Sequence, residues 1–324
     1  MTISAFHGDP ALKAQLVDPV RPRWAARELL PAAILKWVPD ERMYSLCGAL
    51  AESQEQQVFE QRTGIPLALA MLSEALISAS IEITPDPSSP AGFAMHGDDA
   101  IFAFGMEWLD AVRPGADLSD VVPRYAARAL ETVLGADFPL AEQIEPAVAA
   151  AGARVLGLWR RELAGDDVGA VEWRAARVAA VEASERCGKP WCYPVAAFIE
   201  SISWPVRSIA GEFVALFQSL LQSWLTYVRL PFFGERDRED QTLFWIGLRR
   251  MTLAEAEGGL DEEAMATFFD DTPDVKRAMY ALGDADTRAR LRAARVGATV
   301  ATTPVVRQQM DVLLQLIGNA GEPR

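Results

Sequence analysis

The longest amphipathic pattern of the chain runs from Trp204 to Phe233. Its apolar residues recur every three or four positions, which is the period of an α-helix; they are Ile209, Phe213, Leu216, Phe217, Leu220, Trp224 and Val228. Because this apolar arc is wider than a single stripe, we expect a long central helix near 205–230 that other helices surround on most sides. Pro205 suits a first helical turn, and Pro231 ends the pattern.

A membrane span is the alternative interpretation of this stretch. Its longest charge-free piece, Phe213 to Val228, has 16 residues and includes two glutamines, two serines and a threonine. A span requires about 20 predominantly apolar residues, and Glu212 and Arg229 flank the piece directly. We therefore expect a buried helix of a soluble protein, with no membrane as a partner.

The same spacing predicts helices along the rest of the chain. Asp9 and Pro10 are typical of a helix start, and one helix is expected over 167–186. Near the end, the pattern predicts one helix over 285–296 and another that Thr303 caps, that Pro304 begins and that Gly318 follows. The alternation of apolar and polar residues that is typical of β-strands does not recur at regular spacing. We predict an all-α, multi-helix globular bundle.

The domain organisation has two interpretations. One divides the chain into helical regions 1–165 and 166–324, the second packed around the central helix. The other treats the 324 residues as one continuous domain. Half of the residues are hydrophobic, which is enough for a sizeable core.

Charge and cysteine usage narrow the possible partners. The formal net charge is −14, which argues against direct binding of nucleic acid through its phosphates. Acidic mimicry of nucleic acid stays open as an alternative. The N-terminus lacks the pattern of a secretory signal, and the three cysteines are too few for a disulfide scaffold. We expect a cytoplasmic protein. Cys187 and Cys192 enclose four residues, so they are either loop thiols or a labile disulfide.

Several motifs together resemble a known protein family. They are AFHGDPALK (5–13), GIPLALAMLSEALI (64–77), GMEWLDAVRPGADLSDV (105–121), GLWRREL (157–163) and VEWRAA (171–176). The N-terminal half therefore resembles a family of uncharacterised bacterial and phage-associated proteins. The family brings no known activity. Many members carry a cysteine- and histidine-containing segment before Gly-Ile-Pro, of which this chain keeps only Cys47.

Both histidines of the chain precede a Gly-Asp pair. A metal site built from His7, Asp9, His96 and Asp98 would have suitable ligand types. The alternative is that the aspartates cap helices while each histidine forms local hydrogen bonds. The sequence does not establish that the two loops meet.

Motifs of catalysis and of cofactor binding are missing. The sequence has no Gly-x-Ser-x-Gly elbow, no phosphate-binding glycine loop and no Glu-x-x-His pair, so we expect no cofactor. Acid–base carboxylates are the chemistry that is hardest to exclude, with Glu107, Glu200 and Glu212 as candidates.

An aromatic cluster is the strongest candidate for a binding surface. Trp191, Tyr193 and Trp204 lie close to three prolines, and such a cluster is typical of a groove for a ligand or a partner helix. Our leading hypothesis is a non-catalytic helical protein that binds another protein or forms a homo-oligomer through this surface. The alternative is an enzyme, or a protein binding a metal or small molecule, with a pocket between its halves.

Overall fold

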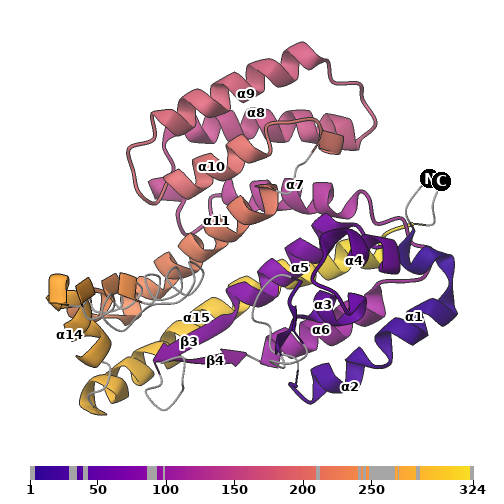
Figure 1. Ribbon diagram of the computed structural model, residues 1–324. Helices are drawn as coiled ribbons and strands as arrows, with labels where there is room; N and C mark the ends of the chain where they lie inside the picture. The colour runs from indigo at the N-terminus through magenta and orange to yellow at the C-terminus, as the bar shows by residue number, and fades with distance from the viewer. Residues whose placement is uncertain are drawn as a thin grey trace. The chain divides into compact units, whose positions relative to one another are not determined.

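The computed structural model describes residues 4–28, 35–38, 43–85, 93–97, 99–208, 212–239, 242–243, 246–247, 267–268, 270–281 and 285–321. The predicted all-α class is confirmed, because helices dominate these residues and the strands are short and paired only two by two (Figure 1). Among the residues described, every helix is too short or too polar to cross a lipid bilayer.

The secondary structure follows the chain in this order: η1 (Ala5–Gly8), α1 (Pro10–Val17), α2 (Val20–Ala25), β1 (Trp37–Val38), β2 (Met43–Tyr44), α3 (Leu46–Ala51), α4 (Gln56–Thr63), α5 (Leu67–Ala79), β3 (Ile81–Pro85), β4 (Phe93–Gly97), α6 (Asp99–Ala111), α7 (Val121–Val133), η3 (Ala141–Gln143), α8 (Pro146–Leu163), α9 (Ala170–Glu185), α10 (Tyr193–Ser201), η4 (Val206–Ser208), α11 (Glu212–Arg229), η5 (Leu230–Phe232), α14 (Pro273–Ala281) and α15 (Ala285–Gly318). β1 pairs antiparallel with β2, and β3 pairs with β4.

The chain forms two compact units. Unit 1 comprises 1–82, 96–227 and 303–324, and unit 2 comprises 83–95 and 228–302. Of the two interpretations of the sequence, one divides the chain near residue 165 and the other treats it as one continuous domain. Residues on both sides of position 165 lie in unit 1, where α8 and α9, which precede and follow that position, pack along each other.

Helix α11 packs into the core of unit 1 with its aromatic face. Phe217 contacts Tyr125 of α7 edge-on, with ring centroids 5.3 Å apart, and it also contacts Phe198 of α10. Trp224 packs against Phe138 in the same edge-on way. This helix begins later than the sequence predicted, because Val206–Ser208 forms the 3-10 helix η4 instead.

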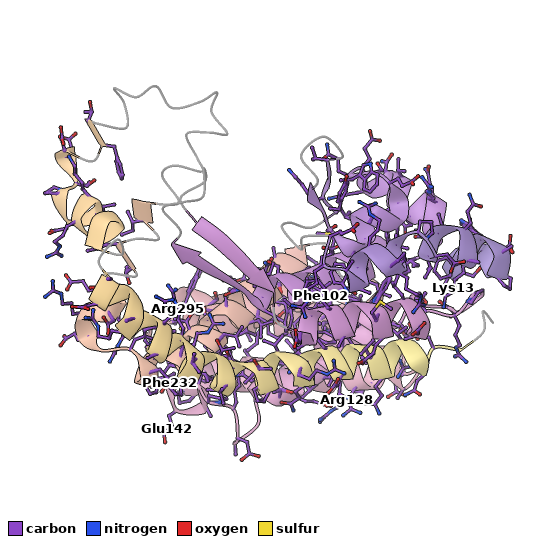
Figure 2. The ribbon with its side chains drawn as sticks, turned by 90° about the horizontal axis from the view of Figure 1, so that it is seen from below. Lys13, Phe102, Arg128, Glu142, Phe232 and Arg295 are labelled. Atoms are coloured by element: carbon purple, nitrogen blue, oxygen red, sulfur yellow. The ribbon has the colours of Figure 1, made fainter. Side chains whose placement is uncertain are left out.

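A close helix crossing organises the N-terminal part of unit 1. Trp24 of α2 is fully buried and donates its indole N–H to the carbonyl oxygen of Phe102 in α6, which Figure 2 labels. A Cβ atom on Gly105 would lie 2.2 Å from the indole nitrogen. Only glycine therefore lets these two helices approach so closely.

Helices α8, α9 and α10 form a neighbouring layer of unit 1 (Figure 1). Trp159 of α8 is buried and donates its indole N–H to the carbonyl oxygen of Ile202, 2.9 Å away. A Cβ atom on Gly152 of α8 would lie only 2.9 Å from the side chain of Ile199 in α10. The layer is thus fixed by one buried tryptophan and one glycine contact.

Unit 2 contains α14 and the first half of α15. The carboxylate of Asp237 is buried and accepts two hydrogen bonds from Arg290, at 2.7 and 2.9 Å. The ring of Phe232, labelled in Figure 2, lies against Gly297 so closely that a Cβ atom there would be 2.6 Å away.

The C-terminal helix differs from the sequence prediction. Two helices were expected, with Pro304 beginning the second, but α15 is continuous and contains Pro304. Proline removes one backbone N–H from a helix interior, which leaves the carbonyl four residues earlier without its partner. That carbonyl belongs to Val300, and both Val300 and Pro304 are exposed, so water can satisfy it. The predicted end near Gly318 is confirmed.

Candidate functional site

The outward face of α9 carries a strip of residues that the core does not use. Val171 and Val178 expose 77% and 51% of their surface. They belong to a series spaced alternately by three and four residues, which places the series on one side of a helix. We call this series the α9 strip; its members are Val171, Arg174, Val178, Val181 and Glu185.

The opposite face of α9 explains why the strip points outward. Its buried side chains are Trp173 and three alanines, Ala176, Ala180 and Ala183. The indole N–H of Trp173 donates to Glu162 of α8 at 2.6 Å, which fixes the rotation of α9 about its axis. The valines of the strip are therefore held away from the core by the packing of the other face.

Two charges of the strip lack ion-pair partners within the part of the chain that the structure describes. They belong to Arg174 and Glu185, which are both exposed. Neighbouring charges on α9 are paired instead: Glu172 binds Arg161 at 2.6 Å, and Glu182 lies 3.7 Å from Arg186. Glu185 is also in the last turn of the helix, where the helix dipole disfavours a negative charge.

Trp204 borders the strip. It is 41% exposed, and the guanidinium of Arg177 lies over its ring, 3.8 Å from the centroid. Arg177 comes from α9, directly before Val178 in sequence, whereas Trp204 follows the end of α10. A guanidinium over an indole face is a favourable cation–π contact, so this tryptophan is held in place while part of its surface stays open.

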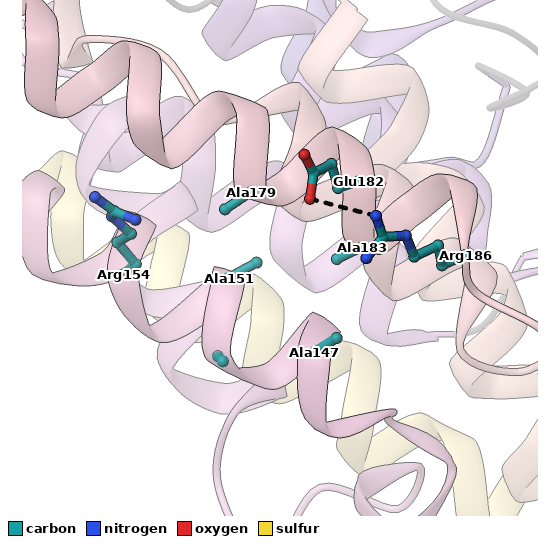
Figure 3. Close-up of a pocket in the computed structure, with 8 residues that line it drawn as sticks. Ala147, Ala151, Arg154, Ala179, Glu182, Ala183 and Arg186 are labelled. Carbon is teal, nitrogen blue, oxygen red and sulfur yellow. Dashed lines mark ion pairs between the residues drawn. The ribbon is translucent and has the colours of Figure 1, made fainter.

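A shallow hollow lies on the other side of α9, between this helix and α8 (Figure 3). Its volume is about 280 Å³, and alanines form most of its lining. Arg154, Glu182 and Arg186 are the charged residues among its lining. Small-molecule sites usually measure roughly 300–1,000 Å³, so this hollow suits a single apolar side chain better than a metabolite.

The three aromatic residues that the sequence singled out lie at the two ends of α10. Trp191 comes just before this helix and packs edge-on against Tyr227 of α11, with centroids 5.3 Å apart. Tyr193 is the first residue of α10 and is 59% exposed. Trp204 follows the opposite end. The structure therefore brings Trp204 beside the α9 strip, and it places Trp191 and Tyr193 at the other end of the helix.

The residues of the predicted metal site have separate local roles where they are described. Nε2 of His7 lies 2.9 Å from the carbonyl oxygen of Gln61. Asp9 accepts a hydrogen bond from the N–H of Ala11 and so caps α1, as predicted. His96 lies in β4, but its side chain is outside the described residues, as is all of Asp98. The described residues contain no group of three or more potential ligands that could hold a metal.

The candidate carboxylates are placed in different ways. Glu107 forms an ion pair with Arg307, at 2.7 Å, and is exposed. Glu200 is half-buried in α10, and the side chain of Glu212 lies outside the described residues.

One buried carboxylate is not among the candidates that the sequence predicts. Glu74 of α5 is only 3% exposed and accepts a hydrogen bond from the backbone N–H of Cys47, at 2.7 Å. Burial raises its pKa to about 7, although hydrogen bonds from Cys47 and Ser45 act in the opposite direction. Burial, and the neighbouring Glu74, raise the pKa of the Cys47 thiol. Ser45 caps α3 by accepting from Gly48. The cluster anchors the start of α3 and has no access to solvent.

Cys187 and Cys192 are close neighbours with free thiols. Burial raises the pKa of Cys192 to about 11, and a hydrogen bond with the Cys187 thiol adds to this. The Cys192 sulfur also accepts the backbone N–H of Glu145 at 3.3 Å. The carboxylate of Glu145 in turn accepts the N–H groups of Gly188 and Lys189. The loop is thus held by Glu145, with the two thiols in their reduced form.

No protein-family model, curated protein or solved structure matches the chain. The resemblance of its N-terminal half to a bacterial and phage-associated family therefore stays a prediction.

The α9 strip is not among the sites that the sequence predicts, because it consists of valines and charged residues and not of the aromatic residues that mark the predicted cluster. The apolar spacing predicts the helix over 167–186, but it does not by itself indicate which of two apolar faces is buried. A second apolar series at seven-residue spacing, opposite the stripe of Trp173, Ala176, Ala180 and Ala183, was visible in the sequence.

Proposed function

We propose that this chain is a non-catalytic helical protein that binds another protein, or a second copy of itself, through the α9 strip and the adjoining Trp204. The single observation that carries the proposal is the exposure of Val171 and Val178 on the outward face of a well-packed helix. Trp191 and Tyr193 lie at the opposite end of α10 from Trp204, and the proposed surface does not include them.

The chemistry of the surface supports a protein partner. Tryptophan and arginine are enriched among residues that dominate binding energy in interfaces, and Trp204 and Arg177 are held against each other beside the strip. Valine is a poorer helix former than alanine, so an exposed valine brings α9 no benefit of its own. A partner that covers Val171 and Val178 would supply that benefit through burial.

The same geometry gives little support to a catalytic role. Glu74 has the raised pKa that acid–base catalysis uses, but a catalytic carboxylate must reach its substrate, and Glu74 is 3% exposed. The hollow between α8 and α9 is lined mainly by alanines, and its volume of about 280 Å³ is below the usual size of a small-molecule site. A protein-binding role uses the residues that are exposed.

A cytoplasmic location is part of the proposal. All three cysteines carry free thiols, and free thiols suit a reducing compartment.

A photo-reactive amino acid at position 178 tests the proposal. The variant is produced in its native host, irradiated, and its adducts are identified by mass spectrometry. Position 226 of α11 is the matched control, because Thr226 is an exposed helical residue of unit 1 outside the strip. We expect a protein adduct at position 178 and none at position 226. Equal labelling at both positions, or no adduct at 178, would contradict the proposal.

A further inference from the structure

The α9 strip is complementary to itself. Along the helix its side chains alternate by three and four residues, which is the spacing of a coiled-coil seam. The series begins with an apolar residue and Arg174, continues with Val178 and Val181, and ends with Glu185. The strip is thus positive near its start, apolar in its middle and negative at its end. In an antiparallel copy of the same strip, the positive part would face the negative end and the two apolar parts would face each other.

The register of such a pair follows from the charges. In an antiparallel pair of identical helices, residues whose numbers have the same sum lie opposite each other. If Arg174 faces Glu185 of a second copy, then Val178 faces Val181 of that copy, and the two-fold axis repeats both contacts. In a parallel pair Arg174 would instead face Arg174 and Glu185 would face Glu185, and such like-charge contacts suppress the arrangement.

Resting on the proposed function above, we infer that the partner of the α9 strip is a second copy of this chain, bound antiparallel with Arg174 of each copy facing Glu185 of the other. This arrangement gives a partner to the two charges of the strip that have no ion-pair partner in the described part of the single chain. It also places the N-terminal half of one α9 beside Glu185 in the last turn of the other, so the two helix dipoles oppose each other favourably.

The neighbouring features fit the same occupant. The strip has Trp204 and Arg177 along one side and the alanine-lined hollow along the other. A second copy lying along α9 would therefore contact both Trp204 and the hollow. One helix from each copy makes a small interface. Small interfaces are typically weak, and we expect a dissociation constant in the micromolar range.

Charge reversal tests the inference, with sedimentation equilibrium as the measurement. The wild-type chain is expected to dimerise. Each single reversal, Arg174→Glu or Glu185→Arg, replaces two attractive contacts by two repulsive ones and should weaken dimerisation by about tenfold or more. The double variant Arg174→Glu/Glu185→Arg restores opposite charges in the same register and should return to within about threefold of wild type. Circular dichroism of each variant checks that α9 stays folded.

Three outcomes would overturn the inference: a wild-type monomer up to high concentration, single reversals without effect on the dimer, or a double variant as weak as the single ones. The photo-reactive residue at position 178 separates this failure from that of the proposed function. If the wild-type chain is monomeric but position 178 forms an adduct with a different protein, the inferred dimer is wrong and the proposed binding surface is supported. If the chain is monomeric and position 178 forms no adduct, both the inferred dimer and the proposed binding surface are wrong.

Discussion

Helices α9 and α11 belong to the same unit and have nearly the same length, but α11 buries several large apolar side chains whereas α9 buries one, Trp173, and leaves two valines exposed. Helix α11 buries Phe213, Phe217 and Trp224 and exposes small or polar residues, among them Ser219 and Thr226. Helix α9 buries mostly alanine and exposes valine. In α11 the pattern is that of a helix whose burial is complete within one chain. In α9 two valines remain exposed, and this exposure is the basis of the proposed partner contact.

The difference shows that apolar periodicity and burial are separate properties. The period of three or four residues predicts that a helix forms, and it does so for both helices. Which stripe faces the core depends on tertiary contacts, such as the hydrogen bond from Trp173 to Glu162. A helix with two apolar stripes therefore needs the structure before its free face is known.

The largest expected effect concerns the buried side of α11. Phe217→Ala removes a ring that packs against Tyr125 and Phe198, and it leaves a cavity. We expect the free energy of unfolding to fall by about 3–5 kcal/mol, measured by urea denaturation. Ser219→Ala, on the exposed side of the same helix, is the control and should change it by less than about 0.5 kcal/mol. Similar effects for both variants would remove the distinction between the faces.

The next largest effect concerns the buried carboxyl group of Glu74 in unit 1. Because burial raises the pKa of Glu74 from 4.5 to about 7, the folded state binds a proton that the unfolded state has already released between these values. Stability should therefore fall as pH rises from 4.5 to about 7, by roughly 3 kcal/mol.

Glu74→Gln keeps an oxygen that can accept from the N–H of Cys47 but cannot ionise. Its stability should lack this decline between pH 4.5 and about pH 7, and it should be at least as stable as wild type at the upper end. Urea denaturation across that range is the measurement. An identical pH dependence in wild type and variant would show that Glu74 is not the titrating group.

The buried side of α9 should tolerate little additional volume. Ala180 lies on the buried face of α9, and Ala180→Leu inserts three carbon atoms into a packed layer. We expect a loss of about 1–3 kcal/mol in the free energy of unfolding. Thermal unfolding checks this, with the exposed Ala153 of α8, changed to leucine, as the control. A stabilising effect of Ala180→Leu would mean that the layer is loosely packed.

The smallest effect is expected on the α9 strip. Val178→Ala removes a half-exposed side chain and improves helix propensity. The free energy of unfolding of the monomer should change by no more than about 0.5 kcal/mol, in the stabilising direction if helix propensity dominates. Urea denaturation at low protein concentration is the measurement. A loss of about 2 kcal/mol or more would show that Val178 belongs to the core.

The sequence predicted the helical class and many helix ends, because caps, prolines and apolar spacing are local features. Asp9 capping α1 and the end of α15 near Gly318 are examples. Pro304 inside α15 was missed, since a proline at a first turn and one in an exposed helix interior look the same locally. The role of Glu74 could not be predicted, because its hydrogen-bond partner Cys47 lies 27 positions earlier in the chain.

The candidate site was predicted only in part. The sequence predicts Trp204 as a binding residue because it belongs to an aromatic cluster close to three prolines, and the structure places Arg177 over its ring. The valines of α9 were not named, because their exposure results from the packing of the opposite face. Trp191 and Trp204 were grouped because they are close in sequence, but α10 separates them.

The dimer dissociation constant of Val178→Ala, compared with that of the wild-type chain by sedimentation equilibrium, tests the central claim most directly. The change removes apolar contacts on both sides of a two-fold axis while leaving monomer stability nearly unchanged. We expect the dissociation constant to rise by about tenfold, with no loss of unfolding free energy. An unchanged dissociation constant, or association that weakens only together with the fold, would contradict the account.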